Sequence, residues 1–111
     1  MPVLSRLLAA MVIALASPLT GVAAADTKAD PAAVLAGKKL VADSKCEACH
    51  AKKVGGDGSS IYRRADRRVT TRSKLLPQVA LCNSELSLGL FPDDETAIAT
   101  YLNSEHYRFK D

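Results

Sequence analysis

This 111-residue chain has no tryptophan and very little methionine. The only methionines are Met1 and Met11, tryptophan is absent, and aromatic residues make up 5% of the sequence. Aromatic side chains therefore cannot build most of a hydrophobic core. The net charge is only +3, and the basic residues lack the interleaved aromatic side chains typical of nucleic-acid interfaces. We therefore expect no nucleic acid among its partners.

The N-terminal segment has the features of a secretory signal. Arg6 precedes an apolar stretch over residues 7–16, and three alanines precede Asp26. This pattern predicts a signal peptide over residues 1–25 and a mature domain over residues 26–111 in the periplasm. The alternative is an uncleaved N-terminal anchor. Because the apolar stretch is shorter than the roughly 20 residues that span a bilayer, we expect no stable membrane insertion after signal cleavage.

Two cysteines and a histidine form the most informative motif, Cys46-Glu47-Ala48-Cys49-His50. Two cysteines separated by two residues and followed directly by histidine are the pattern required for covalent attachment of c-type haem. The two thiols form thioether bonds with the haem vinyl groups, and the histidine ligates the iron. The motif predicts one covalently bound haem c, attached through Cys46 and Cys49, with His50 as the proximal iron ligand.

The pattern of apolar residues predicts helices and no strand. Asp30 and Pro31 are typical of a helix start and precede a helix over residues 31–42. A second helix is expected over residues 75–86, where Leu75, Val79, Cys82 and Leu86 recur at helical spacing. A third follows Pro92, with Asp93 as its cap and a buried stripe of Ala97, Ile98, Tyr101 and Leu102. Residues 54–60 are expected to form a flexible loop. We therefore predict an all-α fold of three to four helices packed around one haem.

The order of these features resembles a class I cytochrome c domain across nearly all of residues 26–111. In that family the first and last helices cross, which implies that Gly37 contacts the aromatic residue of the last helix. The family's methionine ligand is missing here. The segment Gln78 to Asn83, with Tyr62-Arg63 upstream, is similar to the haem-thiolate subunit of the thiosulfate-oxidising Sox cytochrome complex. That second resemblance implies that Cys82, followed by Asn83, supplies the axial sulfur.

The sixth iron ligand has several candidates. Cys82 is an odd cysteine in an oxidising compartment, and a thiolate is a strong ligand for ferric haem. We favour Cys82 as the distal iron ligand. The alternatives are that an Asn83 amide or a His106 imidazole is the ligand, or that the position is vacant. In those cases Cys82 would be a small buried side chain or one half of an intermolecular disulfide. We expect His106 to be a solvated surface residue. A zinc site of Cys46, Cys49, Cys82 and His106 would be a Cys₃His set with unsuitable spacing.

Three functional hypotheses follow. The first is a periplasmic electron carrier with His/Cys axial ligation, more a carrier than a catalyst. The second is a Sox-like subunit that oxidises sulfur compounds through Cys82, and the third is a gas-binding haem sensor. The expected partners are redox proteins. A run of basic residues could attract acidic partners, or it could bind a haem propionate instead. This basic run comprises Arg63, Arg64, Arg67, Arg68, Arg72 and Lys74.

Overall fold

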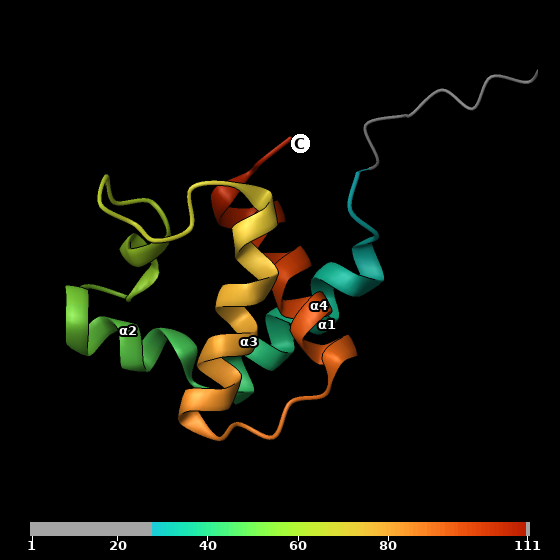
Figure 1. Ribbon diagram of the computed structural model, residues 1–111, viewed down its shortest axis with the longest axis horizontal. Helices are drawn as coiled ribbons and strands as arrows, with labels where there is room; N and C mark the ends of the chain where they lie inside the picture. The colour runs from blue at the N-terminus through green and yellow to red at the C-terminus, as the bar shows by residue number, and fades with distance from the viewer. Residues whose placement is uncertain (1–27, 111) are drawn as a thin grey trace, which may run out of the picture.

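The computed structural model describes residues 28–110, whose only regular secondary structure is helical. Within this range the α-helices are α1 (Pro31–Asp43), α2 (Cys46–Val54), α3 (Leu75–Leu86) and α4 (Pro92–Leu102), and there is no strand (Figure 1). Two short 3₁₀ helices, η1 (Ser59–Tyr62) and η2 (Arg72–Lys74), lie between α2 and α3, and the π-helical turn η3 (Asn103–Tyr107) follows α4. The predicted all-α fold of three to four helices is confirmed. The predicted signal peptide and its cleavage before Asp26 lie outside the described residues.

Capping residues and prolines determine where α1 and α4 begin. In α1, Asp30 accepts a hydrogen bond through Oδ1 from the Ala32 N–H at 3.1 Å, as predicted for the cap. The prediction of Asp93 as the cap of α4 is wrong, because α4 already begins at Pro92. Proline suits the first helical position because it has no N–H and its φ is fixed. Asp94 then accepts a hydrogen bond through Oδ2 from the Phe91 N–H at 3.0 Å.

The helices α1 and α4 cross in close contact at Gly37. A Cβ atom on Gly37 would lie 2.6 Å from the Cβ of Tyr101 and 2.7 Å from the carbonyl carbon of Ala97. Real side chains do not approach so closely, so only glycine permits this crossing. The contact of Gly37 with the last helix is therefore confirmed, and it fixes the helix pair on which the core is built.

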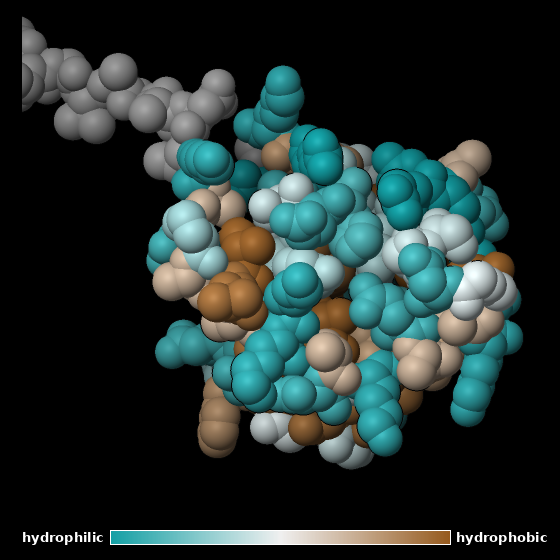
Figure 2. Space-filling model, turned by 180° about the vertical axis from the view of Figure 1, so that it is seen from behind, coloured by the Kyte–Doolittle hydropathy of each residue, from teal (hydrophilic) through white to brown (hydrophobic). Residues whose placement is uncertain are grey.

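The core of the described residues is small and lies where these helices converge. It consists of seven buried apolar side chains from α1, η1, α3, α4 and the segment before η2: Val41, Tyr62, Val69, Leu75, Val79, Ile98 and Leu102. Hydrophilic side chains cover most of the face shown in Figure 2, with apolar ones in small areas between them. Among residues 28–110, no helix is both long and apolar enough to cross a membrane.

Candidate functional site

A cavity of about 360 Å³ lies between α2 and α3. This volume is within the range of roughly 300–1,000 Å³ that is typical of small-molecule sites. All seven buried apolar side chains of the core line the cavity. The core therefore encloses a space instead of closing on itself, although protein interiors normally pack with few voids larger than a water molecule. A bound apolar group would complete this core.

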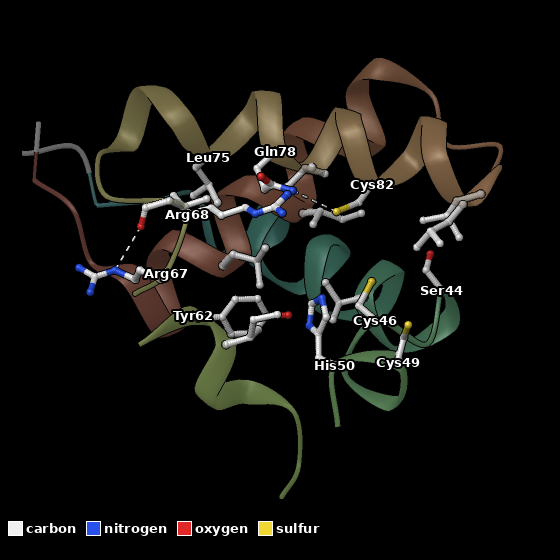
Figure 3. A pocket seen from close by; sticks show the side chains of 18 of the residues that line it. Ser44, Cys46, Cys49, His50, Tyr62, Arg67, Arg68, Leu75, Gln78 and Cys82 are labelled. Atoms are coloured by element: carbon white, nitrogen blue, oxygen red, sulfur yellow. Dashed lines mark hydrogen bonds between the residues drawn. The ribbon is translucent and has the colours of Figure 1, made fainter. Parts of the chain in front are cut away.

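The motif residues reach the cavity from one face of α2. The helix begins at Cys46, after Lys45 in a left-handed conformation. Residues three and four positions apart lie on the same face of a helix, so the spacing groups Cys46, Cys49 and His50, and all three line the cavity (Figure 3). Cys46 and His50 are half-buried and Cys49 is exposed. The structure thus brings the three predicted haem-binding residues together on one wall.

Burial shapes the protonation of these side chains. Loss of solvent lowers the pKa of His50, and the nearby Lys53 charge lowers it further, so the imidazole is neutral at pH 7 and able to bind a metal. Its Nδ1 atom is buried and has no hydrogen-bond partner among the described residues. Burial also raises the pKa of the Cys46 thiol, and the charges of Glu47 and Cys82 add to that effect.

The third cysteine approaches the cavity from the other side. Cys82 lies on α3 and lines the cavity wall opposite His50 (Figure 3). Its inward orientation agrees with the helical spacing of the apolar residues in α3. The Nε2 atom of Gln78, one turn earlier, donates a hydrogen bond to the Cys82 sulfur at 3.4 Å. Cys82 lies near enough to Cys46 that a negative charge on its sulfur would raise the pKa of the Cys46 thiol.

Asn83 does not line the cavity, and its side-chain amide is fully engaged elsewhere. Its Nδ2 atom donates to the Leu90 carbonyl at 2.9 Å and to Glu95 Oε1 at 2.7 Å. Its Oδ1 atom accepts from the Leu90 N–H at 3.1 Å. The residue therefore connects α3 to α4 and to the loop before it, and its oxygen is not directed at a ligand in the cavity.

His106 is not the solvated surface residue that the sequence led us to expect. Both of its ring nitrogens are buried without a hydrogen-bond partner in the described part of the chain. The turn η3 places its ring 4.7 Å from the Tyr62 ring, measured between centroids. His106 lies outside the lining of the cavity. Among residues 28–110, no cluster of three or more His, Cys, Asp or Glu could hold a metal ion, which contradicts the Cys₃His zinc arrangement.

The basic run divides into two groups. Arg64, Arg67 and Arg68 line the cavity, whereas Arg63 is exposed and donates a hydrogen bond to Ser59 Oγ at 3.1 Å. Arg67 is held in place by donating through Nε to the Val69 carbonyl at 3.1 Å. Figure 3 shows Arg67 at the end of the cavity away from Cys46 and Cys49, whereas the guanidinium group of Arg68 reaches towards Gln78. Arg72 and Lys74 do not line it.

Two supporting residues have a structural role that sequence reasoning missed. Tyr62 is 4% exposed, and its ring lies 5.5 Å from that of His50. Gly58 is buried against α2, where a Cβ atom would lie 2.7 Å from the Ala51 nitrogen and 3.0 Å from the His50 Cβ. The expected loop is found only over residues 55–58, because Val54 belongs to α2 and Ser59 and Ser60 to η1. Within this loop, Gly58 supports the helix that carries His50. Nothing in the sequence separates it from its exposed neighbours Gly55 and Gly56.

In comparisons with known protein families, curated proteins and solved structures, no match to this chain was found. The function must therefore be argued from the residues that surround the cavity.

Proposed function

We propose that this protein is a periplasmic monohaem c-type cytochrome that transfers single electrons. The observation that supports this most strongly is the composition of the cavity. A Cys-x-x-Cys-His motif, a third cysteine and all seven buried apolar side chains line the same space. A core arranged in this way is incomplete without a large apolar group, and the motif is the one used for covalent haem attachment.

The residues that line the cavity fit a haem. Cys46 and Cys49 would form the thioether bonds, and His50 would ligate the iron as the neutral imidazole that its lowered pKa favours. A haem carries its two vinyl groups and its two carboxylates on different edges. Arg64, Arg67 and Arg68 line the cavity, and guanidinium groups bind carboxylates with charge-assisted hydrogen bonds. When bound, the haem supplies an iron that alternates between the ferric and ferrous states.

Cys82 is the residue we propose as the distal iron ligand. It faces the cavity from the helix opposite His50, and its rivals Asn83 and His106 do not line the cavity. As a thiolate, Cys82 would donate electron density to the iron and favour its ferric state, so it would lower the reduction potential relative to a His/Met pair. The exposed arginines Arg63 and Arg72 extend the basic surface, which favours acidic redox partners.

The test begins with haem attachment. The full chain is expressed in a bacterial host that assembles c-type cytochromes, and the product is examined by mass spectrometry and optical absorption. We expect one added haem and a Soret band that persists after denaturation, and loss of covalent attachment in the double variant Cys46→Ser, Cys49→Ser. A colourless wild-type protein of unmodified mass overturns the proposal.

The second step tests the distal ligand. Electron paramagnetic resonance and optical spectra are recorded for wild type, for Cys82→Ala and for the control Ser84→Ala, an exposed position on the same helix. We expect a low-spin thiolate signal that only Cys82→Ala removes, together with a rise in the reduction potential. An unchanged spectrum of Cys82→Ala refutes thiolate ligation. Thiosulfate-dependent reduction of an acceptor, or rapid binding of nitric oxide by the ferrous form, would point to a sulfur-oxidising or a gas-sensing function instead.

A further inference from the structure

Gln78 and Cys82 are four residues apart on α3, and both side chains line the cavity. Residues at this spacing are neighbours on a helix surface. The amide nitrogen of Gln78 donates to the Cys82 sulfur at 3.4 Å, the interaction drawn as a dashed line in Figure 3. Gln78 is half-buried, so its amide is partly removed from competing water. The contact is thus built into the helix that presents the sulfur to the cavity.

We infer that Gln78 is a positioning residue that sets the reduction potential through its hydrogen bond to the Cys82 sulfur. The inference rests on the proposed function, because it requires Cys82 to be an iron ligand. A thiolate sulfur can only accept hydrogen bonds, and the Gln78 Nε2 group is a donor. The geometry of the bond therefore suits a ligating thiolate sulfur, which has lone pairs and no proton to donate.

The direction of the effect follows from charge. A hydrogen bond to the ligating sulfur withdraws electron density from it, so the sulfur donates less to the iron and the ferric state is favoured less. Gln78 therefore raises the potential above the value that an unpartnered thiolate would give. It also restricts the rotation of the Cys82 side chain, as residues behind a metal ligand generally do.

The adjacent residue Asn83 does not offer a replacement for this donor. The Asn83 amide is committed to Leu90 and Glu95. Within the described residues, Gln78 is the side chain that donates a hydrogen bond to the Cys82 sulfur. Loss of the Gln78 amide should therefore leave the sulfur without a direct protein donor.

The experiment is a double-mutant cycle on the haem-loaded full chain. The reduction potential and the electron paramagnetic resonance spectrum are measured for wild type, Gln78→Leu, Cys82→Ala and the double variant, with Ser84→Ala as the control. For Gln78→Leu we expect a lower reduction potential. The ferric-to-ferrous ratio at a given applied potential should rise about tenfold, which corresponds to a fall of about 59 mV for a one-electron couple. The effect should vanish in the Cys82→Ala background, because a coupling through the sulfur requires the sulfur.

The outcomes separate the two claims. If Cys82→Ala leaves the spectrum of the haem-loaded protein unchanged, thiolate ligation fails and the inference fails with it. If Cys82→Ala removes the thiolate signal but Gln78→Leu shifts neither the potential nor the signal, only the inference about Gln78 is overturned. An equal shift by Gln78→Leu in both backgrounds also overturns it, because the residue would then act through packing. Gln78→Ala provides a second variant if the leucine side chain disturbs the fold.

Discussion

Replacing Gly58 with alanine tests whether the segment after α2 holds His50 in place. Gly58 has a φ of +84°, and its Cβ would contact the Glu47 carbonyl oxygen, the Ala51 nitrogen at 2.7 Å and the His50 Cβ at 3.0 Å. The first two of these neighbours are backbone atoms of α2, which cannot move without distorting the helix. Gly56 also has a positive φ, +60°, but nothing lies within 4 Å of its Cβ position. Gly56→Ala therefore reports the backbone strain alone, whereas Gly58→Ala reports the strain together with the steric conflict.

The expected magnitudes differ clearly. A left-handed conformation costs an alanine about 1–2 kcal/mol, and the lower entropy of the unfolded alanine chain returns about 0.4–1 kcal/mol. Gly56→Ala should therefore lose about 1 kcal/mol of unfolding free energy. Gly58→Ala carries the same terms and adds about 1–3 kcal/mol for overpacking against atoms that cannot yield. We expect a loss of about 3 kcal/mol in total, or about 2 kcal/mol more than the control.

Thermal and urea unfolding of the purified full chain measure this difference. For a domain of 60–100 residues, 1 kcal/mol changes the melting temperature by about 4–8 °C, so the two variants should differ by about 10 °C. Gly58→Ala should also alter the optical spectrum of the haem-loaded protein, because His50 must shift. Equal melting temperatures for the two variants would refute the reasoning about Gly58.

Two further predictions concern helix packing and His106. Gly37→Ala should lower the free energy of unfolding by about 1–2 kcal/mol, since the clash with α4 outweighs a helix-propensity gain of up to about 1 kcal/mol; urea denaturation measures it, and a more stable variant contradicts it. His106→Phe should raise that free energy by about 1 kcal/mol, because it removes two buried nitrogens that lack partners. Burial, followed by the Arg63 charge, lowers the pKa of folded His106 below its usual 6.5. The unfolded chain therefore binds more protons as the pH falls below about 6.5, so the wild type should lose stability on acidification. Urea titrations at pH 7.5 and 5 should show a smaller loss for His106→Phe; an equal loss would mean that the ring does not titrate with folding.

Three of the four α-helices of the described residues, α1, α3 and α4, could be predicted because their signals are local. The capping of α1 by Asp30, the bounds of α3 at Leu75 and Leu86, and the contact at Gly37 all follow from residue type and helical spacing. The cap of α4 was wrong because Pro92 and Asp93 are both acceptable first-turn residues, and only the chain path decides between them. Local signals thus locate elements to within a residue or two.

The environment of the site could be predicted less well because it depends on contacts between distant segments. The sequence grouped Cys46, Cys49 and His50 through their spacing alone, and the structure places them on one wall. The burial of His106 depends on the π-helical turn η3, which brings its ring against the ring of Tyr62. Tyr62 lies more than 40 residues earlier in the chain. No periodic pattern in the sequence encodes that contact.

The choice between Cys82 and Asn83 shows how the fold decides a question that spacing leaves open. Consecutive residues of an α-helix point about 100° apart, so the orientation of α3 decides which of the two side chains lies in the cavity wall. In this orientation Leu75 and Val79 are buried, Cys82 faces the cavity and Asn83 makes its three hydrogen bonds to Leu90 and Glu95. To exchange the sulfur for the amide oxygen, α3 would have to rotate, expose two core side chains and break all three bonds. If Cys82 ligates a haem iron as proposed, we therefore expect that Asn83 does not replace it when the iron changes its oxidation state.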